Sequence, residues 1–252
     1  MFWEYCVHHR MNREAGSGLS RVSPRGGVRL FCLLNRQRLL NSSEDKMNKR
    51  ILLMGVRPTM TPEMYTERAA RFEDLQGDYR SFVLIADCQA ALTQVQGDVD
   101  LEASVASTVQ FLVDAGFDSG RSICFLQSQI PQLAELSRLA EDGPTPVGSV
   151  VADMLMFRPA RILGGAHDEP SFDLALELQT RFGSAFHDQN AEFEAIPESA
   201  EPDGDAKRDG GSDQREAIRD VLNYGGATAR IEAQKTLEIV REAVGLNYAL
   251  FK

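Results

Sequence analysis

The sequence has few of the residues that bind metal ions or form disulfides, and their spacing fits neither use. The cysteines are Cys6, Cys32, Cys88 and Cys124, and the histidines are His8, His9, His167 and His187. No Cys-x-x-Cys or His-Glu-x-x-His spacing occurs, so neither a zinc site nor a disulfide framework is expected. Scattered unpaired cysteines are typical of a reducing compartment, and we expect a cytoplasmic protein without a bound metal.

Long apolar runs and an excess of positive charge are also missing. The longest apolar runs, near residues 30–34 and 82–86, fall far short of the roughly 20 residues that cross a bilayer, so no membrane span is expected. The 27 lysines and arginines face 37 acidic residues, which gives a net charge of −10. This balance argues against a protein held to nucleic acid by bulk charge, because such binding needs a clustered cationic face.

The charge that is present divides the chain into four expected parts. Residues 1–50 carry ten basic and four acidic residues without periodicity, which predicts a disordered basic leader over 1–47, either a targeting peptide or upstream sequence outside the fold. Residues 188–216 carry ten acids and three bases among Pro, Gly and Ser, which predicts a flexible acidic linker. A core over 48–187 and a C-terminal helical segment over 217–252 are the other two parts.

Apolar runs without alternation, each followed by a helical pattern, predict a buried parallel sheet. Strands are expected over 51–55, 82–86 and 123–126, and over the residues just before Gly164. Helices are expected from Thr61, with Pro62 at the first helical position, and over 101–116 and 132–140. The fold class is therefore α/β, a Rossmann-like parallel sheet with flanking helices.

An amphipathic helix is expected near the end of the chain, where it needs the α/β layer to pack on. Its expected apolar face consists of Ile231, Leu237, Val240 and Val244, and Gly245 is expected to end it.

Generic motifs for nucleotide binding and for nucleophilic hydrolysis do not occur. The pair Gly164-Gly165 follows an expected strand, at the edge where α/β sheets bind ligands, but a plain tight turn explains it equally well.

Several stretches, taken in order, resemble the tryptophanyl-tRNA synthetases. They are Gly55-Val-Arg-Pro-Thr, Leu84-Ile-Ala-Asp-Cys-Gln-Ala, Phe125-Leu-Gln-Ser-Gln-Ile-Pro-Gln-Leu-Ala-Glu-Leu, Ala152-Asp-Met-Leu-Met-Phe and the closing helix over 226–246. The resemblance covers about residues 50–187 and 217–246. It implies a class I synthetase fold that binds ATP and tryptophan and charges tRNA, and it makes the closing helix a remnant of the helical domain.

The sequence departs from this family at its ATP signatures. The first signature reads Thr61-Pro-Glu-Met64, where Glu63 places a carboxylate and a Cβ against the expected phosphate position. No Lys-Met-Ser-Lys-Ser loop is found, and the Gly-Glu-Asp-Gln segment reads Gly165-Ala-His-Asp168, in which we expect His167 to be an exposed loop residue. The resemblance assigns a degenerate nucleotide site to Arg57, Pro58, Thr59, Thr61 and Gly165, with ATP as a doubtful cofactor.

Asp153 matches the family aspartate that accepts the indole N–H of tryptophan. Indole is a donor only and needs an acceptor when buried. The alternative is that Asp153 caps a helix beginning at Met154. By the resemblance, Leu53, Gly55 and Ile162 would line the same pocket.

Three hypotheses follow for a truncated, degenerate paralogue whose catalytic residues are unknown. The first is a protein that binds tryptophan or an indole ligand and cannot aminoacylate tRNA. The second is a residually active, ATP-dependent tryptophan-activating ligase, and the third is a decayed gene product without a ligand. Under the first hypothesis, tRNA is not an expected partner. Dimerisation is usual in the family, so the resemblance implies a homodimer whose interface includes the 127–139 region.

Overall fold

A computed structural model describes residues 50–93, 100–140, 146–182, 186, 191–198 and 212–246 of the chain. The chain divides into two units, Met1–Ser43 and Glu44–Lys252, and every described residue lies in the second. The predicted basic leader therefore lies outside the described residues.

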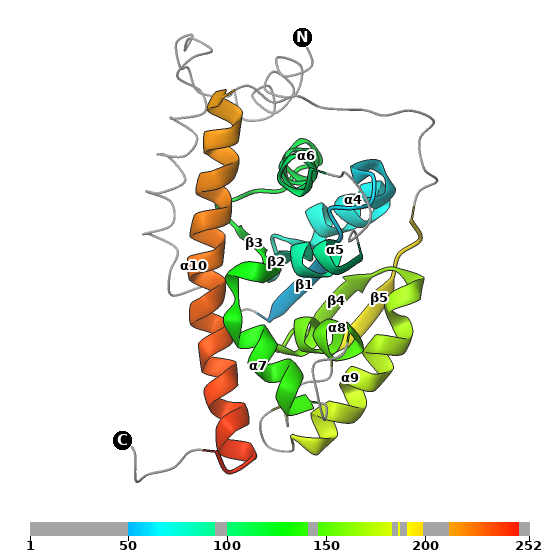
Figure 1. Ribbon diagram of the computed structural model, residues 1–252. Helices are drawn as coiled ribbons and strands as arrows, with labels where there is room; N and C mark the ends of the chain where they lie inside the picture. The colour runs from blue at the N-terminus through cyan, green and yellow to red at the C-terminus, as the bar shows by residue number, and fades with distance from the viewer. Residues whose placement is uncertain are drawn as a thin grey trace. The chain divides into compact units, whose positions relative to one another are not determined.

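The described core contains a five-stranded sheet whose order is β3-β2-β1-β4-β5 (Figure 1). The strands are β1 (Ile51–Val56), β2 (Arg80–Ile85), β3 (Ser122–Leu126), β4 (Arg161–Gly164) and β5 (Glu192–Ala195). Every pairing between neighbouring strands is parallel. The predicted Rossmann-like α/β class is confirmed.

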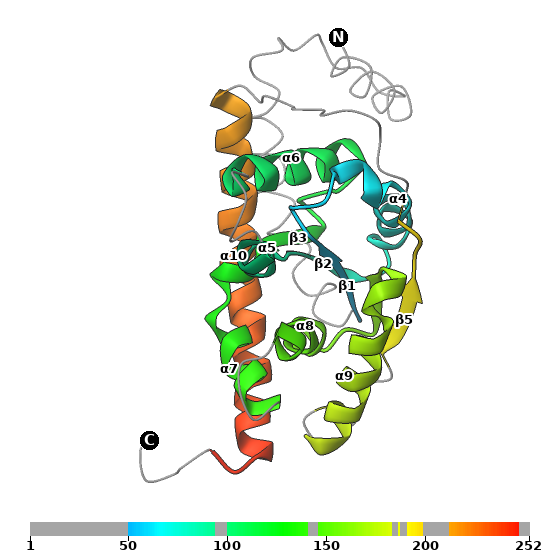
Figure 2. The same cartoon turned by 45° about the vertical axis from the view of Figure 1, so that its right-hand side comes forward.

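Side chains of alternate residues along the strands pack into two separate hydrophobic cores, one on each face of the sheet. Leu52 and Met54 pack with α4 (Thr66–Leu75) and α6 (Leu101–Asp114), whereas Leu53 packs with the opposite layer. That layer consists of α7 (Pro131–Ala140), α8 (Pro146–Leu155) and α9 (Glu169–Arg181) (Figure 2). Because both faces are covered, the strands read as continuous apolar runs rather than alternating ones.

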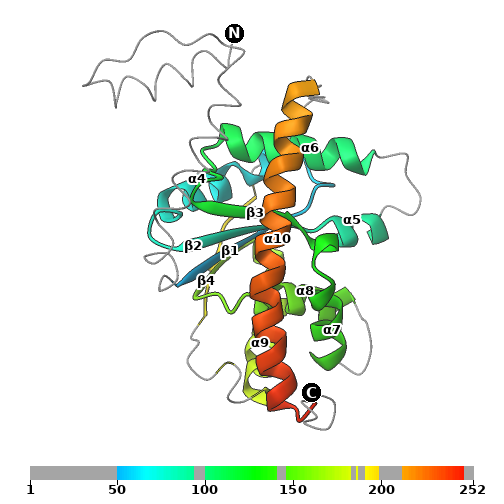
Figure 3. The same ribbon diagram turned by 90° about the vertical axis from the view of Figure 1, so that its left-hand side faces the viewer.

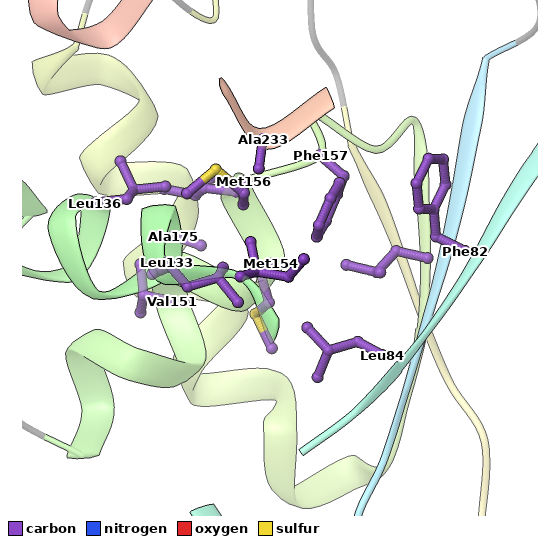
Figure 4. Packing of buried hydrophobic residues seen from close by; sticks show 14 of the residues in the cluster. Phe82, Leu84, Leu133, Leu136, Val151, Met154, Met156, Phe157, Ala175 and Ala233 are labelled. Carbon is purple, nitrogen blue, oxygen red and sulfur yellow. The ribbon is translucent and has the colours of Figure 1, made fainter. Parts of the chain in front are cut away.

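The core on the side of α7, α8 and α9 is centred on the end of α8. Figure 4 shows Met154 and Phe157 pointing toward Phe82 and Leu84 of β2. The rings of Phe82 and Phe157 stack with their centroids 5.1 Å apart, and Phe157 is fully buried. This packing fixes the end of α8 against the sheet, and Asp153 lies in that part of the helix.

The predicted helices form, with one change at the first. Residues after Thr61 form a short 3-10 helix, η2 (Pro62–Tyr65), before α4 begins, and the Thr61 side chain makes no capping hydrogen bond. Helix α6 is capped by Asp100, whose carboxylate accepts from the backbone N–H of Ala103 at 3.1 Å. Two further 3-10 turns, η3 (Gln127–Gln129) and η4 (Ala166–Asp168), and helix α5 (Asp87–Thr93) complete the described elements of this half.

Strand β5 corrects the prediction of a linker over 188–216. Residues 192–195 pair with β4, although they carry two glutamates and lie between acidic stretches. Arg71 and Arg161 neutralise Glu194, and Phe193 stacks on Phe172 of α9 with centroids 5.0 Å apart. Ion pairing and one aromatic contact therefore hold a strand that composition alone marks as a loop.

The closing helix, α10 (Ser212–Ala243), is longer than predicted and covers the outer edge of β3 (Figure 3). It begins inside the segment predicted to be a linker. A Cβ on Gly225 would lie 1.7 Å from the backbone oxygen of Cys124 in β3, so the helix backbone touches the strand backbone directly. Covering an edge strand in this way protects its unpaired backbone groups.

The predicted apolar face of α10 is partly wrong. Leu237 and Val240 are buried, but Ile231 is 62% exposed and Val244 is 41% exposed. The buried face also contains Leu222 and several small or polar residues, namely Gly225, Ala229, Glu232, Ala233 and Thr236. Close packing on a strand backbone requires small residues, and hydrophobic periodicity in the sequence does not detect them. Gly245, the glycine predicted to end this helix, lies just after it with φ +77°, a conformation that favours glycine.

Glu232 is a buried carboxylate that ties α10 to the amino ends of β2 and β4. It accepts from Arg80 at 2.7 Å, and Arg158 lies 3.6 Å away. Burial acts to raise the pKa of Glu232, but the hydrogen bond from Arg80 and the charge of Lys235 outweigh it, and the net pKa lies below the usual value. The ionised form is thus the one that the fold stabilises.

We expect Glu232→Gln to lower the free energy of unfolding by about 1–3 kcal/mol at pH 7, because two arginines lose their buried counter-charge. Urea denaturation measures this loss. Glu238→Gln, on the exposed face of the same helix, is the control and should change stability by less than about 0.5 kcal/mol. Equal effects of the two substitutions would contradict the assigned role.

Candidate functional site

The connections of the sheet place a crevice at the carboxyl ends of β1 and β4. From β1 the chain continues to β2 and β3 on one side, and β4 and β5 lie on the other side. Open α/β sheets bind ligands at such a switch point. A cavity of about 70 Å³ lies there, and its walls come from β1, α4, β2, α8 and β4, from the turns after β1 and β4, and from Glu198 beyond β5.

The four residues predicted to bind tryptophan or indole line this single cavity. Leu53 and Gly55 come from β1, Ile162 from β4 and Asp153 from α8. Leu84 and Met154 add further apolar walls. The structure thus brings together residues that lie up to about a hundred positions apart in the sequence, which places them where a common ligand could touch them.

The residues predicted for a degenerate nucleotide site are less well gathered. Arg57 lines the cavity, but Pro58, Thr59 and Thr61 are not among the described residues that line it. The Thr61 hydroxyl is buried and has no hydrogen-bond partner within the described part of the chain. Gly165 flanks the cavity, and its N–H donates to the Asp168 carboxylate at 3.0 Å.

Asp153 is inside α8, two residues before its end, so the alternative prediction that it caps a helix starting at Met154 is wrong. Its side chain is buried, and the residue is only 7% exposed. The amide nitrogen of Gln127 donates to its two oxygens at 2.9 and 2.7 Å, and that of Gln89 donates at 2.9 Å. A buried carboxylate needs such donors to offset lost hydration.

Burial is the largest influence on the Asp153 carboxyl, and it raises the pKa to about 8. The hydrogen bonds from Gln127 lower this pKa, and the nearby charge of Asp87 raises it further. The group therefore titrates near neutrality, unlike an ordinary aspartate. A buried carboxyl that lines a crevice and has such a shift is typical of a functional position.

Charged side chains also line the cavity. Arg57 pairs with Asp168 at 3.2 Å, and His167 lies 3.2 Å from Asp168 and 3.4 Å from Glu198. His167, expected to be an exposed loop residue, is 40% exposed at its side chain and lines the cavity. Arg68 is buried beside it, with its side chain only 4% exposed.

Tyr65 holds the turn after β1 in place. Its hydroxyl accepts from the Arg57 backbone N–H at 2.7 Å and donates to the Arg57 backbone oxygen at 3.2 Å. Burial raises the pKa of Tyr65 to about 12, so the phenol is neutral at physiological pH. The turn is thereby fixed by a neutral donor and acceptor rather than by charge.

Sequence reasoning missed four of these residues, which are Gln89, Gln127, Arg68 and Glu198. Gln89 and Gln127 lie in stretches quoted for the family resemblance, so that resemblance could have singled them out. Arg68 and Glu198 gave no signal, because an arginine in an amphipathic helix and a glutamate in an acidic stretch are both ordinary surface residues.

The described residues contain neither a candidate metal cluster nor a candidate membrane span. No group of three or more His, Cys, Asp or Glu side chains in that part of the chain is placed to hold a metal ion. No helix among those residues is long and apolar enough to cross a membrane.

The chain is similar in sequence to curated tryptophan–tRNA ligases. It is 28% identical over 213 residues to that of Streptococcus agalactiae serotype V, which covers 71% of this chain and 62% of the relative. It is 29% identical over 187 residues to that of Corynebacterium efficiens, covering 62% and 53%, respectively. The chain thus spans less than two thirds of the length of these relatives. No protein-family model matches it.

Solved structures with similar folds carry the same family name. A tryptophanyl-tRNA synthetase from Mycoplasma pneumoniae superposes with a TM-score of 0.64 at 13% identity, covering 81% of this chain and 100% of that one. One from Campylobacter jejuni gives 0.59 at 16% identity, covering 79% and 100%, and it has also been solved with ADP and tryptophan. At these identities the structures establish the fold. Together with the sequence relatives, they confirm the resemblance to tryptophanyl-tRNA synthetases predicted from the motifs.

Proposed function

We propose that this relative of the tryptophanyl-tRNA synthetases binds tryptophan or a closely related indole and does not charge tRNA. The observation that carries the proposal is Asp153, a buried carboxylate that two glutamine amides hold in the wall of a cavity lined by several apolar side chains. The protein would act by binding, as a sensor or accessory protein. The C. jejuni synthetase solved with ADP and tryptophan is a relative in fold with such a ligand.

The donor and acceptor inventory of the cavity favours an indole next to Asp153. Indole offers one N–H donor and no acceptor, and Asp153 is an acceptor when ionised. The apolar side chains of Leu53, Leu84 and Ile162 would pack on the ring faces, where burial of apolar surface is favourable. Gln127 and Gln89 would keep the carboxylate oriented, because their amides already occupy its other acceptor positions.

The turn after β1 is a poor phosphate site, which supports loss of ATP chemistry. Phosphate binds at a helix start through bare backbone N–H groups. Here the first helical residue is Pro62, which has no N–H, and the segment is a 3-10 turn that carries Glu63 in its first turn. Arg57, the cation predicted for this site, already pairs with Asp168.

Calorimetric titration of the full chain with tryptophan and with ATP separately tests the proposal. We expect tryptophan to bind, ATP not to bind at millimolar concentration, and Asp153→Ala to weaken tryptophan binding at least about tenfold, because a buried hydrogen bond to a charged group contributes about 1.5–3 kcal/mol. Asp173→Ala, an exposed aspartate on α9, is the matched control. Absence of any heat or thermal shift with tryptophan would contradict the proposal and favour a decayed gene product.

The competing function is a residually active tryptophan-activating ligase. It would need Arg57, Thr59 and Thr61 to hold phosphate without a lysine loop. Tryptophan-dependent pyrophosphate exchange at ordinary synthetase rates, abolished by Asp153→Ala, would establish that function instead.

A further inference from the structure

Arg68 is a buried cation in the crevice whose charge is poorly matched by the protein itself. Its guanidinium lies between the ends of β1 and β4, where one terminal nitrogen donates to the Gly55 backbone oxygen at 2.9 Å. A Cβ on Gly165 would lie 2.9 Å from the other terminal nitrogen. The Nε–H is buried and has no acceptor in the described part of the chain. The described part of the chain therefore leaves donor capacity of this side chain unused.

Among the described residues, the carboxylate paired with Arg68 is that of Glu198, and the contact is long. Glu198 lies 3.5 Å from Arg68 and 3.4 Å from His167. Charge-assisted hydrogen bonds normally measure about 2.7–2.9 Å, and in this chain Arg241 and Glu135 reach 2.6 and 2.7 Å with both nitrogens. An arginine cannot shed its proton to escape burial. It is stabilised when a better placed anion arrives.

We propose that Arg68 binds the carboxylate of the ligand, and that Glu198 occupies this position in the empty protein and is displaced when the ligand binds. The inference rests on the proposed function, since it names the ligand class of the same cavity. The ligand is an aromatic carboxylic acid whose indole N–H meets Asp153 at one end and whose carboxylate meets Arg68 at the other. Both residues line the cavity, from α8 and α4 respectively.

The charge balance of the crevice selects a carboxylate over a polyphosphate. Two guanidinium groups, Arg57 and Arg68, face two carboxylates, Asp168 and Glu198. One ligand carboxylate that takes the place of Glu198 leaves this balance unchanged. A triphosphate would add several negative charges next to Asp168, and like charges close together in a poorly solvated site repel strongly.

The test compares indole-3-acetate with 3-methylindole, which lacks the carboxylate, by calorimetric titration at pH 7. The full chain should bind the acid at least about tenfold tighter. Arg68→Met should remove this preference, whereas Arg71→Met should preserve it. Arg71 is on the same helix and pairs with Glu194 outside the cavity. Equal affinity of the two compounds for the unmodified chain would overturn the inference.

Glu198→Gln provides a second test that does not depend on replacing the buried Arg68. Without the competing carboxylate, the acid should bind several-fold tighter while the affinity for 3-methylindole stays the same. Glu194→Gln, a glutamate of β5 that does not line the cavity, is the control. An unchanged affinity for the acid in Glu198→Gln would show that Glu198 does not occupy the position. If neither compound binds at all, the proposed function itself fails.

Discussion

Replacing Gly225 with alanine is expected to destabilise the protein by about 3 kcal/mol or more, although alanine is the better helix former. In an open helix this substitution gains about 1 kcal/mol. Here the new Cβ would lie 1.7 Å from the backbone oxygen of Cys124 and 2.7 Å from its carbonyl carbon. Backbone atoms in the sheet cannot rotate away, so α10 must move off β3 and loosen the contacts of its buried residues.

Gly226→Ala is the matched control, because it makes the same chemical change one residue further along α10. Its Cβ would lie 2.3 Å from the side-chain oxygen of Gln129, which is the end of a flexible side chain that can turn aside. That movement breaks one hydrogen bond to the Leu126 backbone N–H, measured at 3.1 Å. We therefore expect a change within about 1 kcal/mol.

Urea denaturation of both variants gives the two free energies, and amide hydrogen exchange in β3 reports whether the helix has left the strand edge. A Gly225→Ala variant as stable as the Gly226→Ala variant would show that α10 does not rest on the β3 backbone.

The same helix shows why its buried face could not be predicted correctly. Hydrophobic periodicity selected Ile231 and Val244, which are exposed, and overlooked Gly225, Ala229 and Glu232. Close contact with a strand backbone favours the smallest residues, and Glu232 is buried because Arg80 and Arg158 neutralise it. Both causes depend on residues far away in the sequence, up to 152 positions for Arg80 and Glu232, so no local pattern carries them.

The candidate site also combines residues that could be predicted from the sequence with residues that could not. The strands, the glycines at their ends and the pocket position of Asp153 could be predicted, because parallel strands end at a common edge and the motif order resembles a known family. Arg68 and Glu198 could not, because their burial arises only when α4 and the residues after β5 meet at that edge. The side chains that carry the proposed carboxylate site are therefore unremarkable in the sequence.

Stability of the empty protein should depend on the protonation of Asp153. Burial raises the pKa of this carboxyl to about 8, whereas its pKa in the unfolded chain is about 4. Between these values the folded protein binds a proton that the unfolded chain does not, so the contribution of Asp153 to stability is full below pH 4 and is lost as pH rises toward 8. The loss amounts to at most about 1.4 kcal/mol per pH unit.

Asp153→Asn removes this titration and serves to isolate it. The difference in unfolding free energy between the unmodified chain and the variant should shift by up to about 3 kcal/mol between pH 6 and pH 8, with the unmodified chain losing stability. Taking the difference cancels the other groups near the cavity that titrate or carry charge, namely Asp87, Cys88, His167, Asp168, Glu198, Arg57 and Arg68. A difference that is constant with pH would show that Asp153 is already ionised at pH 6.

Ligand affinity should respond to the same proton with the opposite sign. An indole N–H needs an acceptor, and the ionised carboxylate of Asp153 is a stronger one than the protonated carboxyl, in which one oxygen carries a proton. Tryptophan should therefore bind more tightly as pH rises from 6 to 8, by up to about tenfold per pH unit, while Asp153→Asn binds it more weakly and without this dependence. Calorimetric titrations at pH 6, 7 and 8 measure the slope. A flat profile in the unmodified chain, together with the stability shift above, would mean that Asp153 titrates in the empty cavity but does not accept the indole N–H.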